Sequence, residues 1–195
     1  LTSKGLRKDA DAVNSLTNEE VAAIENGIAN VYYLHANPLS SRIYRTLWEL
    51  DNFRRGNNPY GNSIGQRIVA WKAAFACIAK QSFFGAGTGD VMIAMREEYP
   101  QVTPKLSELF WIKPHNQFLS VAVAFGLCGL VWFLLVLFLP VIIAHKTKDY
   151  FYGLFFITTL LSMLAEDTLG TQAGVTFFVF FHCLFLFGRR NLKSN

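Results

Sequence analysis

Arg67 has a side chain suited to binding phosphate and lies in an otherwise apolar stretch. The stretch, residues 63–84, reads SIGQRIVAWKAAFACIAKQSFF and has its large apolar residues at helical spacing. A guanidinium is a planar fork that matches two phosphate oxygens. Arginines in such places also extend from a membrane interface into water with no further role. The residue types alone leave these two interpretations equal.

His115 is the second residue whose type could do chemistry. It lies in the stretch KPHNQF, residues 113–118, immediately before a long apolar run. Histidine is the usual general base near neutral pH. The alternative is an ordinary residue at a helix start, beside Asn116 as the cap. His182 lies inside the last apolar run, where a hydrogen-bonded packing role is expected.

The stretch GAGTGD, residues 85–90, is a third candidate, because closely spaced glycines can expose backbone amides to a phosphate. Its spacing is not that of the dinucleotide-binding fingerprint, and no strand precedes it. A flexible turn after a helix is therefore the favoured interpretation. The three cysteines show no metal-ligand spacing, and no metal site is expected.

Apolar runs predict the elements that carry these residues. Residues 118–144 contain no charge, and about 20 helical residues suffice to cross a bilayer. Pro140 should kink or end this span near its far side. Residues 150–165 and 168–188 are also apolar and flank the acidic pair Glu166 and Asp167. Together these runs predict three transmembrane helices.

Basic residues predict which side of the membrane each loop faces, because they favour the cytoplasm. They occur in the turn between the first two runs and in the tail, at Lys146, Lys148, Arg189, Arg190 and Lys193. With three spans, both basic sites fall on one side. His115 and Glu166 then share the opposite, periplasmic side.

The composition supports an all-α membrane protein with a polar first third. The 195 residues are 52% hydrophobic and 16% charged, against about 25% charged in average soluble domains. We expect a polar periplasmic region at 1–63, an interfacial motif region at 64–117, spans at 118–187 and a basic cytoplasmic tail at 188–195. Helices are predicted from Thr17 or Asn18 through residue 35 and over residues 41–53. The chain starts without methionine or a signal peptide, which predicts a fragment of a longer protein.

Four motifs, in order, resemble the O-antigen ligase family of bacterial polytopic membrane proteins. They are SIGQR-x-x-x-W-K-x-A, FFGAGTGD, KPHNQFLSVAVAFGLCGL and LAEDTLGTQAGVTFFVFF. The resemblance covers about residues 60–187, whereas residues 1–59 match no motif. It implies glycan transfer from an undecaprenyl-pyrophosphate carrier to an acceptor hydroxyl, on the periplasmic face of the bacterial inner membrane. It implies no metal, no nucleotide-sugar cofactor and no nucleic-acid partner.

The resemblance also implies roles for five residues. Arg67 would bind the pyrophosphate and His115 would activate the acceptor hydroxyl. Lys72 and Lys113 would add positive potential, and Glu166 would orient His115 or line the acceptor path. The family has many more spans than three, so this portion is expected to be inactive alone.

The sequence leaves three functions open. The first two are a ligase, whose acceptor is the lipid A core, and a polymerase of the same family, whose acceptor is another carrier-linked glycan. A non-catalytic transporter or scaffold subunit is the third alternative. It predicts that His115 and Arg67 lie apart in space.

Overall fold

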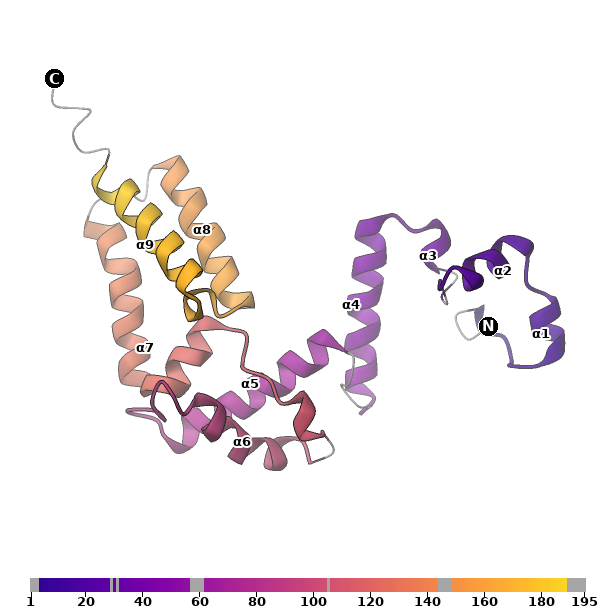
Figure 1. Cartoon of the computed structure of the whole chain (residues 1–195), viewed down its shortest axis with the longest axis horizontal. Coiled ribbons are helices and arrows are strands. Elements are labelled where there is room, and N and C mark those ends of the chain that lie inside the picture. The colour runs from indigo at the N-terminus through magenta and orange to yellow at the C-terminus, as the bar shows by residue number, and fades with distance from the viewer. Residues whose placement is uncertain are drawn as a thin grey trace, which may run out of the picture. The chain divides into compact units, whose positions relative to one another are not determined.

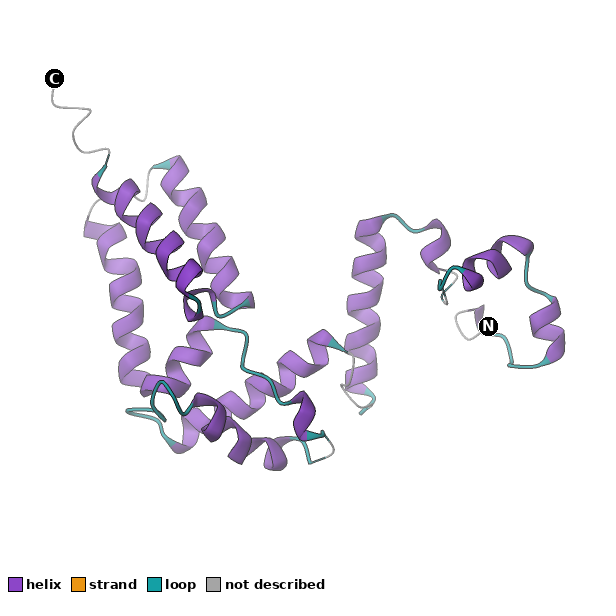
Figure 2. Cartoon of the chain, in the orientation of Figure 1, coloured by secondary structure: helices purple, strands orange, loops and turns teal. Residues whose placement is uncertain are grey.

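The computed structural model describes residues 4–28, 30, 32–56, 62–104, 106–143 and 149–188. Every regular element in this described part is a helix, as predicted (Figure 2). The chain divides into two units, residues 1–57 and residues 58–195.

The first unit consists of short helices ending in a longer one. Its helices are α1 (Ala10–Asn14), α2 (Asn18–Glu25), α3 (Tyr32–His35) and α4 (Pro38–Arg54). The predicted start of α2 is confirmed: Thr17 caps the helix and exchanges hydrogen bonds with Glu20. The predicted continuation to residue 35 is wrong, because α2 ends before Gly27, whose φ is 84°. The helix predicted over residues 41–53 is α4, which is longer at both ends.

The second unit carries all the motifs. Its helices are α5 (Ser63–Lys80), α6 (Val91–Val102), α7 (Gln117–Ile143), α8 (Tyr150–Ala165) and α9 (Gln172–Phe187), with short 3-10 turns η2 (Glu108–Phe110) and η4 (Thr168–Gly170). Helix α5 packs on α6 and α7 through a face of small buried residues, Val69, Ala70, Ala73, Ala74 and Cys77. Helices α7, α8 and α9 lie side by side, each in contact with the next (Figure 1).

Helix α7 is broken inside its apolar run, at Gly126, where φ is 67° and ψ is −169°. Figure 1 shows the change of direction at this point. A break frees backbone carbonyls, and the loop after α5 supplies donors for two of them. Ala86 N donates to Val123 O and Gly87 N donates to Ala124 O, each at 2.8 Å. The Ala86 and Gly87 amides of GAGTGD are therefore used within the fold, and α7 holds the turn in place.

Two glycines allow this close approach of backbones. A Cβ on Gly126 would lie 2.2 Å from Phe83 O, and one on Gly85, whose φ is 68°, would lie 2.5 Å from the Gly126 nitrogen. On the far side of the break, Leu127 N donates to Ser82 O at 2.7 Å. Pro140, where a kink or the end of the span was predicted, lies in the last turn of α7, which ends at Ile143.

One helix among the described residues, α7, is long and apolar enough to cross a membrane. Helices α8 and α9 are apolar but have 16 residues each, about 24 Å at 1.5 Å per residue. All three pack around a cluster of apolar residues, Leu137, Val141, Tyr152, Phe156, Met163 and Leu186. His182 joins this layer, and its Nδ1 lies 3.2 Å from Tyr152 Oη, which confirms the predicted packing role. The basic residues that predicted sidedness, at 146, 148, 189, 190 and 193, lie outside the described residues.

Candidate functional site

The structure brings together Arg67, His115 and Glu166, which come from three separate parts of the second unit. His115 Nδ1 lies 2.8 Å from Glu166 Oε2. Arg67 Nη2 donates to Glu166 Oε1 at 2.5 Å, and its Nη1 donates to Ala165 O at 2.7 Å. The Arg67 fork therefore holds both the last carbonyl of α8 and the carboxylate that follows it.

The charge of Glu166 determines which nitrogen of His115 carries the proton. The hydrogen bond from His115 holds the pKa of the Glu166 carboxyl below its usual range, and the nearby Arg67 charge acts in the same direction. An ionised carboxylate only accepts hydrogen bonds, so Nδ1 of His115 must be the donor. When the ring is neutral, Nε2 is then the free acceptor, which is the state a general base needs.

The segment before α7 presents the His115 ring while burying its neighbours. Pro114 and Asn116 are buried, whereas the His115 side chain is 39% exposed. Asn116 caps α7 by accepting from Leu119 N at 3.0 Å, which confirms the predicted cap. Its Nδ2 also donates to Leu164 O at 3.0 Å and so ties the start of α7 to α8.

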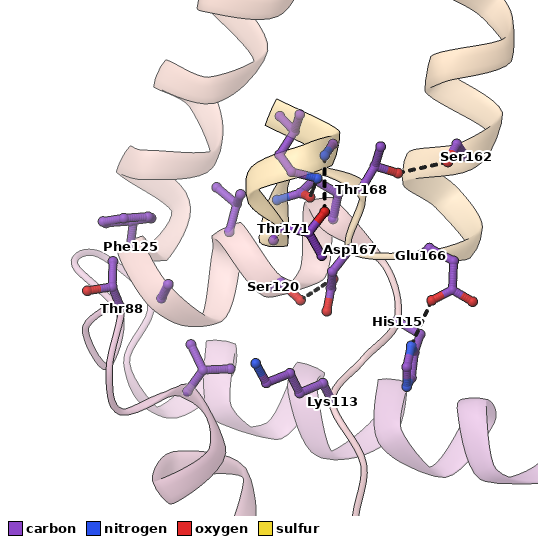
Figure 3. A pocket seen from close by; sticks show the side chains of 17 residues that line it. Thr88, Lys113, His115, Ser120, Phe125, Ser162, Glu166, Asp167, Thr168 and Thr171 are labelled. Carbon is purple, nitrogen blue, oxygen red and sulfur yellow. Dashed lines mark hydrogen bonds and ion pairs between the residues drawn. The ribbon is translucent and has the colours of Figure 1, made fainter. Parts of the chain in front are cut away.

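A cavity of about 860 Å³ opens beside this segment. Figure 3 shows its labelled lining, which includes Lys113, His115, Ser120, Glu166 and Asp167. Hydroxyl-bearing side chains and an aromatic ring also line it, at Thr88, Ser162, Thr168, Thr171 and Phe125, together with apolar residues such as Val91, Val121 and Leu169. The cavity therefore offers a histidine, a cation and two carboxylates to a polar ligand.

Two of the predicted cations do not line this cavity. Lys72 is exposed on α5, and Arg67 reaches Glu166 from beside the cavity. Lys113 is exposed and lines the cavity, and it makes no hydrogen bond or ion pair within the described residues. Of the three predicted cations, Lys113 therefore lines the cavity, whereas Arg67 and Lys72 lie on α5 and do not line it.

Two hydrogen bonds at this site were not predicted from the sequence. Ser120 Oγ donates to Asp167 Oδ1 at 2.6 Å in the cavity wall. Trp71 Nε1 donates to Pro114 O at 2.7 Å. The available signals were the acidic pair at residues 166–167 and the spacing of four between Arg67 and Trp71, which puts both on one helix face.

A family model described as O-Antigen ligase matches residues 26–134, more than half of the chain. The chain belongs to the O-antigen ligase family. This confirms the predicted family, and the match covers the first three motifs but not the fourth, which begins at Leu164. The match includes Arg67 and His115, begins in the first unit where no motif was recognised, and ends before Glu166. No curated protein matches the chain.

Membership in the O-antigen ligase family gives the general class of activity. The family acts in ligation or polymerisation of envelope glycans and is associated with the membrane. The long apolar helix α7 agrees with that association.

Proposed function

We propose that this protein transfers a glycan from an undecaprenyl-pyrophosphate carrier to an acceptor hydroxyl, at the periplasmic face of the bacterial inner membrane. The acceptor is the lipid A core or a similar glycan. The observation that carries the proposal is the Glu166 carboxylate, which binds both His115 and Arg67 beside a cavity lined by polar and apolar residues. In this arrangement α7, α8 and α9 are the three spans.

His115 is the proposed general base. The acceptor hydroxyl gives its proton to Nε2 while its oxygen attacks the anomeric carbon of the donor glycan. The bond from that carbon to the carrier's pyrophosphate breaks, and the pyrophosphate leaves with the electron pair. The imidazolium that forms is stabilised by Glu166 through Nδ1, as a carboxylate does in hydrolytic triads.

Positive charge near the leaving pyrophosphate lowers the energy of the transition state. Lys113 is placed for this role, because it lines the same cavity as His115. Arg67 uses two of its five N–H donors on Ala165 and Glu166, and its side chain is 34% exposed. Its other donors are proposed to meet the pyrophosphate. Lys72 adds positive charge on the same helix.

Replacing the proposed base and the proposed phosphate ligand tests this function. We expect His115→Ala or Arg67→Ala to abolish glycan transfer in the native membrane, with membrane insertion and protein level unchanged. Arg96→Ala is the matched control, because Arg96 is exposed on α6 and does not line the cavity. Wild-type transfer by both variants would refute the mechanism.

Lipopolysaccharide gels of the same strains separate a ligase from a polymerase. Loss of a ligase leaves free lipid A core with no attached glycan. Loss of a polymerase leaves single repeat units attached to the core. We expect the ligase pattern for His115→Ala.

A further inference from the structure

Helix α5 contacts the surroundings of His115 from two successive turns of one face. Arg67 holds Glu166, and one turn later the Trp71 indole donates to Pro114 O at 2.7 Å. We infer that Trp71 is a positioning residue for the proposed reaction. Its indole N–H fixes the peptide before His115, so that the imidazole stays on Glu166 with Nε2 available to the acceptor. This inference rests on the proposed function.

The backbone of His115 needs such a constraint. The φ of His115 is 47°. Among the described residues, His115 is the one residue other than glycine whose φ is positive. The left-handed conformation is unfavourable for a residue with a side chain, because its Cβ comes too close to the following carbonyl oxygen. Residues persist in such conformations only where the surroundings over-determine them, and they cluster at functional sites.

Contacts on both sides of His115 provide the constraint. On the N-terminal side, Pro114 O is held by Trp71 of α5. On the C-terminal side, Asn116 Nδ2 is held by Leu164 O of α8. The next residue is fixed as well, because Gln117 Oε1 accepts from Leu169 N of η4 at 2.7 Å.

Pro114 immediately precedes His115. In the described part of the chain, no hydrogen bond to Pro114 is found other than the one from the Trp71 indole. If the indole N–H is lost, the Pro114 peptide can rotate and His115 can relax toward a common backbone conformation. The imidazole would then leave Glu166 or turn Nε2 away from the cavity. Small misplacements of a catalytic group cost much of its rate advantage.

The alternative is that Trp71 only fills space, and the chain provides a matched control for that. Trp111 stacks on Tyr99 with ring centroids 5.2 Å apart, and its buried Nε1 has no partner within the described residues. Replacing either tryptophan with phenylalanine keeps an aromatic ring. Only Trp71→Phe removes an indole hydrogen bond of the described structure.

The test compares Trp71→Phe with Trp111→Phe by two measurements on the protein in its native membrane. The first is kcat and KM for glycan transfer from the lipid-linked donor. The second is the rate at which diethylpyrocarbonate modifies His115, followed by mass spectrometry of the peptide that contains it. We expect Trp71→Phe to lower kcat about tenfold or more, to leave KM close to wild type, and to change the modification rate. Trp111→Phe should leave all three close to wild type.

The other outcomes would overturn either the positioning role of Trp71 or the proposed function. Wild-type kcat in Trp71→Phe overturns the positioning role, and so does a lowered kcat with unchanged modification of His115. Equal effects of the two substitutions would reduce Trp71 to packing and also overturn it. Transfer by His115→Ala would refute the proposed function instead, so the two failures are distinguishable.

Discussion

Glu166 joins two side chains that are far apart in the sequence. It accepts from His115, 51 residues away, and from Arg67, 99 residues away. Its negative charge lies between a guanidinium and an imidazole that gains a proton in the proposed reaction. The carboxylate therefore determines where the ring points and which of its nitrogens carries the proton.

Replacing Glu166 tests its effect on the tautomer. In Glu166→Gln the amide can donate to Nδ1, which favours the tautomer with the proton on Nε2, and that tautomer cannot act as the base. We expect glycan transfer to fall on the order of tenfold or more, measured as kcat. Glu108→Gln is the control, because Glu108 is exposed on η2. An unchanged kcat in Glu166→Gln would exclude an orienting role.

The lowered pKa of Glu166 gives a prediction for pH and stability. A carboxyl whose pKa is lower in the folded state stabilises the fold above its unfolded pKa, about 4.3, and loses that contribution as the pH falls through the folded value. Wild type should therefore unfold at a higher temperature than Glu166→Gln at neutral pH. The difference should vanish in strong acid. Thermal unfolding of the solubilised proteins across this range measures it, and a pH-independent difference would contradict it.

At the scale of the elements, the break in α7 turns the start of that helix toward the site. Residues 117–125 begin two positions after His115 and contribute Gln117, Ser120 and Phe125 to the cavity wall. Residues 127–143 continue the apolar run beyond Gly126. The loop after α5 supplies the hydrogen bonds at the break, so α5 is connected to the site both through Arg67 and through this loop.

Substituting Gly126 tests the break. A Cβ there would lie 2.2 Å from Phe83 O, in a backbone conformation that alanine rarely adopts. We expect Gly126→Ala to destabilise the protein by about 2 kcal/mol or more and to lower transfer as well. Gly153→Ala in α8 is the control, because an added Cβ there meets nothing within 4 Å. Thermal unfolding of both variants measures the difference, and equal stabilities would show that the break is not required.

At the scale of the molecule, the proposed topology puts the site and the basic turn on opposite sides of the membrane. Lys113 lines the cavity, and Lys148 belongs to the turn that the sequence assigns to the cytoplasm. In a background with the three native cysteines replaced by alanine, we expect Lys113→Cys to react with a membrane-impermeant maleimide added from the periplasm. Lys148→Cys should react only after the membrane is permeabilised. Labelling of both from one side would refute three spans.

Features that depend on short stretches of chain were predictable from the sequence alone. The uncharged run predicted the long helix α7, Thr17 and Asn116 predicted two helix starts, and the ordered motifs predicted the family. These signals are local, because apolar length, caps and motif order are readable within a few residues. They made Arg67 and His115 candidates for the functional site. They did not distinguish these roles from an arginine at the membrane interface and a histidine at a helix start.

The contacts of those candidate residues became known from the folded structure. It placed Glu166 between Arg67 and His115, set Trp71 against Pro114, and broke α7 at Gly126, where no break was predicted. Each of these depends on backbone and side-chain groups that meet across dozens of residues of chain. No local propensity encodes such a meeting. The packing of α5 against α7, and of α7 against α8, brings the partners within hydrogen-bonding distance.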